Sequence, residues 1–343
     1  YSTQSVSEEE LNKIRPNDIS LALAGKVAGL QLLGTPSSNF GEANVRLRGV
    51  SSLTGTNPIY VVDGTVVNLN AVNLDDVANV TVLKGPSATA LYGFRGAGGV
   101  VMITTKRGSK GEPSVTVSSL TEVGHVSLLP KYQNEYGGGY SQEWQTFNYN
   151  PAIHPAEWAS FQGQKLVEYN ADESWGPRMD GSLVREWFSW YPGEDFGKLT
   201  PFSPNPDAVR NFYENSLRTN NNITFDGGGE YTTFRLSYNN RITTLPFPNT
   251  KRNENIIGFR GTFNKNKFSV STSINVINIA QKGDRTEGYT NDGQNISQNF
   301  NQWWQRQLDI EKLKDYKNPA GGYKTWNIRA PHDPTPAYWD NMY

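Results

Sequence analysis

Apolar and polar residues alternate with a period of two along several segments after residue 113. The alternating segments start near Val115 and Ile223 and run over residues 234–239, 257–264 and 268–276. In the last segment, Phe268, Val270, Thr272, Ile274 and Val276 share one face, and Ser269, Ser271, Ser273 and Asn275 share the other. Because successive side chains of a strand point to opposite faces, this pattern predicts β-strands with one apolar and one polar face. The polar tetrapeptide Asn264–Lys267 predicts a short turn between the last two strands. Both transmembrane barrels and soluble sandwiches show such alternation, so the pattern alone leaves both architectures open.

The first thirty residues show helical spacing instead. Ser7 and Glu10 have the spacing of a capping box, which predicts a helix starting directly after Ser7. After Pro16, Ile19, Leu23 and Val27 recur about every fourth residue, which predicts a second helix that Gly29 can end.

Residues 57–108 contain a dense series of turn signals between short apolar runs. In order, we expect a strand at Ile59–Val62, an Asp63-Gly64 turn, a strand at Val66–Val67, a strand at Val80–Leu83, a Gly85-Pro86 break, a helix at Ser87–Tyr92, a glycine-rich turn at Gly93–Gly99 and a strand at Val100–Thr105. Asp-Gly favours a tight turn with positive φ, and Gly-Pro ends one element while starting another. This stretch is therefore predicted to be a small α+β unit.

The same residues carry a resemblance to a known family through the order of their motifs. The motifs are LRGV at Leu47–Val50, NPIYVVDG at Asn57–Gly64, VLKGPSATALYG at Val82–Gly93, and GVVMITTKRG at Gly99–Gly108. Together they closely resemble the plug domain of TonB-dependent outer-membrane transporters, especially the SusC/RagA-like branch of the Bacteroidota. Downstream, Ser174–Gly181 (SWGPRMDG) looks like the early barrel signature of that family, and Gln302–Lys317 and Trp326–Arg329 also match it. The resemblance therefore spans nearly the whole chain.

The resemblance implies a mainly β protein with a small α+β plug domain at residues 1–112. An incomplete antiparallel transmembrane β-barrel follows at residues 113–343, with Lys110–Pro113 as the hinge. The segments 127–219 and 282–343 are then expected to be long extracellular loops. About five or six strands are visible, against the ~22 of plugged outer-membrane transporters. We therefore expect the chain to be part of a longer polypeptide that supplies the TonB box and the remaining strands.

By the same resemblance, the chain is expected to be a TonB-dependent importer in the cell outer membrane. The implied partners are TonB, a SusD-like surface lipoprotein that closes over the ligand, an oligosaccharide or peptide ligand, and outer-membrane lipid. Three alternatives stay open: a SusC-like structural subunit of an outer-membrane complex, a barrel intermediate bound to assembly machinery, and a soluble glycan-binding β protein. A complete strand set and a TonB box would favour transport over a scaffolding role.

The plug signature residues are expected to act in structure or gating. They are Arg48, Gly49, Asp63, Gly64, Lys84, Ser87, Tyr92, Gly93, Arg95, Gly99 and Lys106. The basic residues at positions 46, 48, 84, 95, 106 and 107 are expected to pair with acids of the plug or of the inner barrel wall. Individual ion pairs in wet interfaces contribute little, so a plug held by them could rearrange without melting the barrel. The glycines at 93, 96, 98 and 99 follow a helix and open a strand, the reverse of a dinucleotide loop, so they are expected to form a seating turn.

Composition offers no support for catalysis or for nucleic-acid binding. The 32 Lys and Arg residues nearly balance the 33 Asp and Glu residues. The absence of cysteine excludes thiolate sites, and His125, His154 and His332 have no ligand spacing. Asp63, Asp75 and Asp76 are interpreted as turn or cap residues rather than as a calcium site. We therefore expect no catalytic residue, metal or cofactor, and a protein that is not an enzyme.

Nine tryptophans all lie outside the plug region, mostly in the predicted loops. They are Trp144, Trp158, Trp175, Trp187, Trp190, Trp303, Trp304, Trp326 and Trp339. Structural packing or contact with a partner protein is the favoured interpretation, with an interfacial girdle and stacking on sugar rings as the alternatives.

Overall fold

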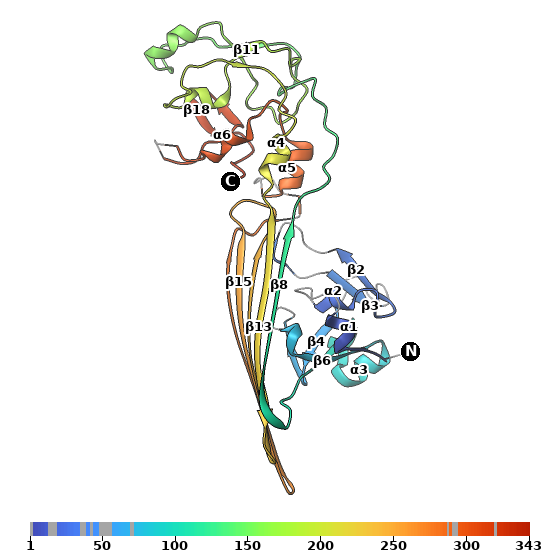
Figure 1. Ribbon diagram of the computed structural model, residues 1–343. Coiled ribbons are helices and arrows are strands. Elements are labelled where there is room, and N and C mark those ends of the chain that lie inside the picture. The colour runs from blue at the N-terminus through green and yellow to red at the C-terminus, as the bar shows by residue number, and fades with distance from the viewer. Residues whose placement is uncertain are drawn as a thin grey trace. The chain divides into compact units, whose positions relative to one another are not determined.

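The computed structural model describes residues 3–12, 19–34, 39–41, 44–47, 57–68, 72–286, 288–289, 294–318 and 321–343. The chain forms two compact units (Figure 1). Unit 1 contains Tyr1–Val123, Leu217–Thr244 and Lys251–Lys282, and unit 2 contains Gly124–Ser216, Leu245–Thr250 and Gly283–Tyr343. Arg48 and Gly49 lie outside the described residues. The domain boundary predicted at residue 112 lies within unit 1 and stays a prediction.

The plug region of unit 1 (residues 1–112) is built around a five-stranded mixed sheet. Its strands are β1 (Thr3–Ser7), β4 (Ile59–Val62), β5 (Thr65–Val67), β6 (Val77–Leu83) and β7 (Val100–Thr105), in the order β1-β6-β7-β4-β5. β4 and β7 pair in parallel, and the other neighbours are antiparallel. Three short helices, α1 (Glu8–Asn12), α2 (Ile19–Leu23) and α3 (Pro86–Tyr92), and the pair β2 (Leu30–Gly34) and β3 (Asn44–Leu47) complete it. The strands and helix predicted within residues 57–108 are therefore confirmed.

The helical start of the plug region follows the predicted capping chemistry. The backbone N–H of Ser7 donates to Glu10 Oε2 at 3.1 Å, and the backbone N–H of Glu10 donates to Ser7 Oγ at 3.4 Å. Ile19, Leu23 and Val27 are all buried in the plug core, as their spacing predicts. The second helix nevertheless ends at Leu23, so the predicted end at Gly29 is wrong. Gly25, with φ of 72°, already turns the chain out of the helix.

The rest of unit 1 is one long sheet. Its strands are β8 (Gly111–Gly124), β13 (Ser216–Gly228), β14 (Thr232–Thr244), β15 (Lys251–Lys265) and β16 (Phe268–Lys282), in the order β16-β15-β14-β13-β8. From β13 to β16 the strands form an antiparallel meander. The turn predicted at Asn264–Lys267 is present, with Asn266 at a φ of 55°. The mainly β fold class is confirmed. β8 already starts at Gly111, so most of the predicted hinge at Lys110–Pro113 lies within this strand, and residues 106–110 connect β7 to β8.

The two faces of the long sheet differ in chemistry. Phe259 pairs with Leu236 and Ile274 across β14, β15 and β16, and Ile257 pairs with Tyr238 and Val276. These apolar positions include exposed side chains: Leu236, Tyr238, Ile257, Ile274 and Val276. The opposite face carries Arg235, Ser237, Arg260 and Ser273, which lie beside the plug region. The predicted separation of apolar and polar faces is thus present, whereas lipid contact by the apolar face stays a prediction. No helix within the described ranges is long and apolar enough to cross a membrane.

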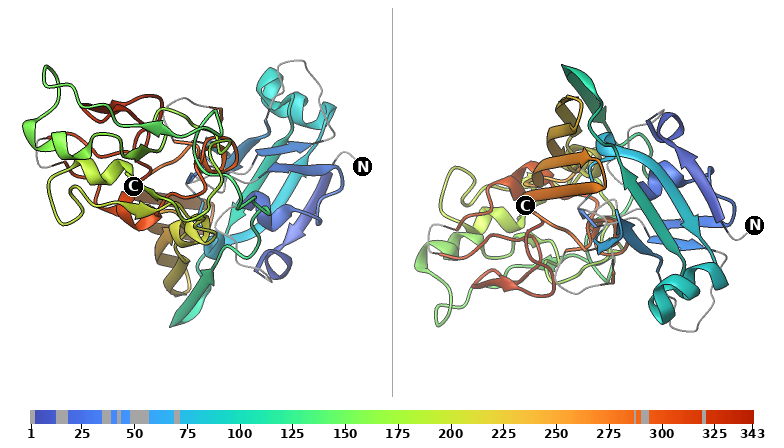
Figure 2. Two further views of the ribbon diagram at one scale, coloured as in Figure 1. Left: turned by 90° about the horizontal axis from the view of Figure 1, so that it is seen from above. Right: turned by 90° about the horizontal axis from the view of Figure 1, so that it is seen from below.

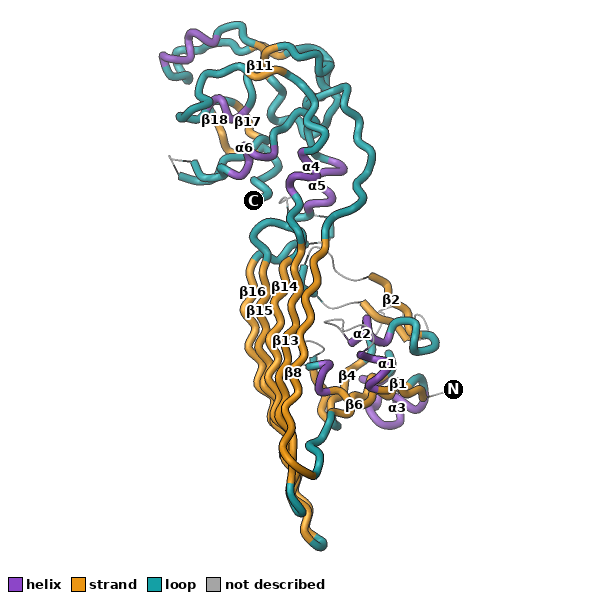
Figure 3. The backbone as a smooth tube through the Cα atoms, viewed as in Figure 1, coloured by secondary structure: helices purple, strands orange, loops and turns teal. Residues whose placement is uncertain are grey.

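Unit 2 differs from the predicted long loops. Its two long segments, residues 124–216 and 283–343, run through one another (Figures 1 and 2). Although Figure 3 colours most of the unit as loop, it has a large shared core. Its short elements are β9 (Gln145–Thr146), η4 (Ala156–Phe161), β10 (Lys165–Leu166), β11 (Leu183–Val184), η5 (Trp187–Trp190), β12 (Thr200–Pro201), α4 (Ala208–Phe212), α5 (Ile296–Gln302), α6 (Ile310–Lys314), β17 (Ile328–Ala330) and β18 (Asp333–Pro336). The tryptophans at 158, 187, 190, 304, 326 and 339 are buried in this core, while Trp175 is exposed. Structural packing therefore accounts for most of them.

The motif at Ser174–Gly181 belongs to unit 2 and contains no strand of the long sheet. Ser174 Oγ donates to the carbonyl of Trp304 at 2.8 Å and accepts from the backbone N–H of Arg306 at 2.9 Å. The backbone N–H of Gly138 donates to Gln307 Oε1 at 2.8 Å. The motif therefore connects the two long segments of unit 2, and its resemblance to the early barrel signature of the family stays a prediction.

Candidate functional site

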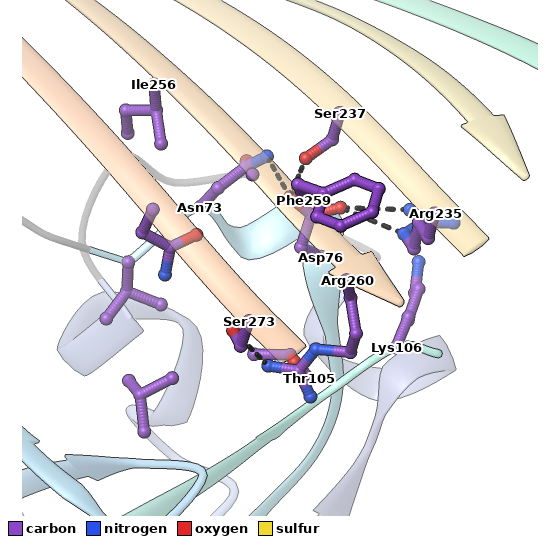
Figure 4. A pocket seen from close by; sticks show the side chains of 14 residues that line it. Asn73, Asp76, Thr105, Lys106, Arg235, Ser237, Ile256, Phe259, Arg260 and Ser273 are labelled. Atoms are coloured by element: carbon purple, nitrogen blue, oxygen red, sulfur yellow. Dashed lines mark hydrogen bonds and ion pairs between the residues drawn. The ribbon is translucent and has the colours of Figure 1, made fainter. Parts of the chain in front are cut away.

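Asp76 is the centre of a polar contact between the plug region and the long sheet, both within unit 1. It lies in η2 (Leu74–Asp76), whose first turn is capped by the side chain of Asn73. Figure 4 shows Asp76 between Arg235 and Ser237 of β14. Arg235 donates to Asp76 Oδ1 from Nε at 3.1 Å and from Nη2 at 3.0 Å. Ser237 donates to the other carboxylate oxygen, which also accepts from Asn73 Nδ2 at 2.9 Å.

A second acid of the plug region, Asp63, makes a similar contact with β15. It occupies the turn between β4 and β5 at a φ of 47°, as the Asp-Gly sequence predicts. Its carboxylate accepts from Thr105 at 3.1 Å and 2.9 Å and forms an ion pair with Arg260. Arg260 also donates to Ser273 of β16 at 3.1 Å. Asp63 is therefore held from both sides, by its own sheet and by the long sheet.

A third contact between the plug region and the long sheet combines a hydrogen bond to a backbone carbonyl with ion pairs. Arg252 Nη1 donates to the carbonyl oxygen of Phe40 at 2.7 Å, and its Nη2 pairs with Glu254 at 3.0 Å. Arg241 lies on the other side of Glu254, with an N···O distance of 3.6 Å. All three side chains are at least nine-tenths buried. Because Glu254 lies between the two guanidinium groups, its negative charge partly compensates the positive charges of Arg241 and Arg252.

The space enclosed by these contacts is small and polar. A cavity of about 40 Å³ is lined from the plug region by Asn73, Asp76 and Lys106 and from the long sheet by residues that include Arg235 and Asn275. A cavity needs roughly 10–15 Å³ to hold one water molecule, so this one has room for only a few. An oligosaccharide or peptide cannot enter it. The arrangement is a contact surface with space for water, and it offers no ligand site.

The predicted plug signature residues are divided between this contact and the interior of the plug region. Asp63 and Gly64 form the turn, with Gly64 at a φ of 91°. Lys106 pairs with Glu8 at 2.6 Å and donates to the carbonyl of Asp75 at 2.8 Å. Lys84 is buried and donates to the carbonyl of Ala28. Ser87 and Tyr92 are half-buried on α3. The structure thus brings Asp63 to the long sheet, and the described contacts of Lys84 and Lys106 stay within the plug region.

The ion pairs between the plug region and the long sheet have the opposite arrangement of charges from the one expected. Basic plug residues were expected to pair with acids, some of them on the barrel wall. In the described residues the ion pairs between plug region and long sheet run the other way, with Asp63 and Asp76 as the acids and Arg260 and Arg235 as the bases. Arg95 is exposed. The sequence signal for these partners was the arginine on the polar face of the alternating segments 234–239 and 257–264.

The glycine-rich turn packs within the plug region. A Cβ at Gly96 would lie 2.6 Å from the carbonyl oxygen of Ala88, and one at Gly99 would lie 2.5 Å from Leu47 Cδ1. Gly99 has a φ of 99° and Gly93 one of 58°, although the space around Gly93 is open. Close approach therefore explains two of the glycines. A seating contact of this turn with a barrel wall stays a prediction.

Two histidines that are distant in sequence meet in unit 2. The rings of His154 and His332 are 5.3 Å apart, although their spacing gave no such indication. Burial and the neighbouring His332 lower the pKa of His154. The described residues contain no group of three or more His, Cys, Asp or Glu side chains that could hold a metal ion.

Comparison with known proteins finds similarity to TonB-dependent receptors. Residues 1–100 match the family model described as TonB-dependent Receptor Plug Domain. TonB-dependent receptor P26 of Formosa agariphila is 35% identical over 191 residues, covering 50% of this chain and 19% of that protein. TonB-dependent receptor SusC of Bacteroides thetaiotaomicron is 28% identical over 257 residues, covering 66% of this chain and 24% of SusC. The resemblance seen in the motif order is confirmed.

A solved structure shares the fold. The RagAB peptide importer in its closed-closed state aligns with a TM-score of 0.59 and 22% identity, over 85% of this chain and 32% of that chain. At this identity the likeness concerns the fold alone. The chain spans about a quarter or less of the length of these curated relatives, which are named as receptors and not as enzymes.

Proposed function

We propose that this chain, which carries a TonB-dependent receptor plug domain, forms the plug and part of the wall of a SusC-type outer-membrane importer. The importer takes up glycan or peptide nutrients beneath a SusD-like lipoprotein, and TonB supplies the pull that moves the plug. The SusC similarity supports this assignment, and RagAB, which is named as a peptide importer, supports a peptide as one of the two ligand classes.

The polar contact between plug region and long sheet carries the proposal. Asp76 and Asp63 are attached to the sheet through ion pairs and hydrogen bonds around a cavity with room for water. Water can replace such contacts one by one, so separating these surfaces costs much less than opening an apolar core of the same size. A plug attached in this way can move while the wall stays folded.

The opposite face of the long sheet supports a place in the membrane. Its exposed apolar side chains, such as Ile274 and Val276, form a surface that lipid chains would cover. Alternation of an apolar outer face with a polar inner face is the pattern of outer-membrane barrel walls. We therefore place the chain in the cell outer membrane.

A reversible cross-link between plug and wall tests the proposal in cells that make the whole protein. Ser237 donates directly to Asp76, so the pair Asp76→Cys and Ser237→Cys can form a disulfide across the contact. Uptake and surface binding of labelled oligosaccharide and peptide pools are measured together. Oxidation is expected to stop uptake and leave surface binding intact, and a reductant is expected to restore uptake.

The matched control places a disulfide within the wall alone. Thr233 and Thr262 face each other across β14 and β15, and their hydroxyls touch. The pair Thr233→Cys and Thr262→Cys should cross-link the wall without restraining the plug, and uptake should continue. Uptake that continues with the Asp76–Ser237 disulfide closed would refute a moving plug. Surface binding without uptake in the unmodified protein would favour the structural-subunit alternative.

A further inference from the structure

Charge is divided very unevenly between the two units. Unit 2 has 20 Asp and Glu against 13 Lys and Arg, a formal net charge of −7, whereas unit 1 has 13 against 19, a net charge of +6. The near-neutral whole chain hides this difference. A surface with an excess of one sign concentrates ions of the other sign around it. Unit 2 therefore favours cationic molecules.

Unit 2 also contains a cavity of a size suited to a small ligand. Its volume is about 420 Å³, and a second cavity of about 230 Å³ adjoins it, with Phe188, Asp195, Asp309 and Lys312 lining both. Ligand pockets commonly measure roughly 300–1,000 Å³. The larger cavity can therefore hold a small molecule or the end of a chain-like one.

The lining of the larger cavity combines aromatic rings with an excess of carboxylates. Trp187, Phe188 and Tyr191 supply the rings. Five acids line it, Glu194, Asp195, Asp309, Glu311 and Asp315, against the two bases Lys312 and Lys324. Trp187 Nε1 and Tyr191 Oη are buried and have no hydrogen-bond partner among the described residues. Because buried polar groups are normally satisfied, this wall differs from an ordinary finished core.

Two lysines of the chain already show how ammonium groups are held here. Lys312 Nζ pairs with Asp195 and lies 5.1 Å from the ring centre of Phe188. Lys324 Nζ pairs with Asp315 and lies 5.6 Å from the ring centre of Tyr191. Each ammonium group is thus placed between a carboxylate and an aromatic face, a combination that attracts cations through both groups.

Asp309 is a further carboxylate beside the ring of Phe188 in the lining of this cavity. Its carboxylate accepts from the backbone N–H of Glu311 at 2.9 Å as the cap of α6, and it lines both cavities. Within the described ranges, no Lys or Arg forms an ion pair with it. Burial raises the pKa of Glu186 to about 8, and the charge of Asp309 acts in the same direction. The negative charge of Asp309 is therefore left for a molecule that enters the cavity.

We propose that this cavity binds a ligand bearing ammonium groups, with the Asp309 carboxylate as its anchor and Phe188 as the neighbouring aromatic face. A lysine side chain of a peptide and the amine of an amino sugar share this chemistry. The inference depends on residues of unit 2 alone. It is therefore tested by binding, with no need for a moving plug or for transport.

Calorimetric titration of the whole protein in detergent distinguishes the two sources. The probes are trilysine and its fully N-acetylated form, and chitotriose and its fully N-acetylated form. We expect at least one of the two amines to bind, and its acetylated partner to bind at least tenfold more weakly, because acetylation removes the charge. Binding of chitotriose alone would identify an amino sugar as the source, and binding of trilysine alone would identify a peptide.

Matched variants separate this site from general attraction by the acidic unit. Asp309→Asn keeps a side chain that caps helices well and removes the charge, so the fold is retained and amine affinity should fall about tenfold or more. Glu143→Gln removes one charge from an exposed side chain of the same unit and should change affinity less than twofold. Phe188→Leu should weaken binding roughly two- to fivefold. Absence of binding by both amines, equal binding of acetylated probes, or equal effects of Asp309→Asn and Glu143→Gln would overturn the proposal.

Discussion

Neutralising Asp76 tests whether the plug is held to the wall by a shared charge network. Arg235 lies between two acids, with Nη2 at 3.0 Å from Asp76 and Nη1 at 4.0 Å from Asp226. The three side chains are 13–17% exposed. At an effective dielectric constant of about 20, these distances correspond to gross attractions of about 5.5 and about 4 kcal/mol. Most of this gain is offset by the cost of removing the charges from water.

The network predicts a strongly non-additive result. Asp76→Asn leaves Arg235 paired with Asp226, so the plug should lose only about 1 kcal/mol. Asp226→Asn should cost a similar amount, since Asp76 then remains. The double variant leaves the buried guanidinium without an acid and should cost about 3–5 kcal/mol, more than the sum of the two single costs.

A buried thiol provides the assay. This chain has no cysteine, so Val80→Cys places a unique thiol within it, in the fully buried centre of the plug core. The rate at which the thiol is labelled, measured against denaturant concentration, reports the free energy of plug opening. As a control, Glu194→Gln breaks an exposed ion pair with Lys198 and should change that free energy by less than ~0.5 kcal/mol. Costs of the two single variants that add to the double cost within ~0.5 kcal/mol would refute the shared network.

Three further predictions concern the sheet, the glycine turn and unit 2. Ile274→Arg on the apolar face should cost about 2–4 kcal/mol and Ser271→Arg on the other face less than ~1 kcal/mol, as measured by heat stability of the folded protein; equal losses would contradict the facial assignment. Gly99→Ala, with both a φ of 99° and a crowded Cβ position, should cost about 2 kcal/mol or more in the thiol assay, and Gly93→Ala, with open space around it, about 1 kcal/mol; a larger cost at Gly93 would argue against close packing. Because burial raises the pKa of Glu186 from 4.5 to about 8, the folded state keeps a proton that the unfolded chain releases, and stability should fall as pH rises between these values. Glu186→Gln should flatten the pH dependence of the melting temperature, and an unchanged slope would show that Glu186 is not its source.

The sequence predicted the elements whose burial follows a simple period. β15 and β16 each have one apolar face, so the alternation at 257–264 and 268–276 was readable without a partner strand. β13 was recognised only near Ile223, although it extends over 13 residues. Its asparagines at 220–222 interrupt the alternation, and pairing with β14 extends the strand where local pattern gives no signal.

The contacts of the candidate site could not be predicted in the same way. Asp76 was interpreted as a turn or cap residue, whereas the cap is supplied by Asn73. Its partner Arg235 is 159 positions away, and a single sequence contains no measure of such proximity. Unit 2 was missed for a related reason. Its core consists mostly of irregular chain, so its buried tryptophans have no periodic spacing and resemble loop residues until the two segments are brought together.

The interleaving of unit 2 also sets the order in which the protein can fold. Its core joins residues 124–216 to residues 283–343, and β13 to β16 lie between these segments in the chain. Asn327, for example, donates to the carbonyl of Tyr169 at 3.0 Å across 158 positions. Contacts of such high sequence separation form slowly, and until they form the first segment exposes Trp187, Trp190 and its other aromatic side chains. Until the strands and the second segment have followed it, this exposed apolar surface is prone to aggregation.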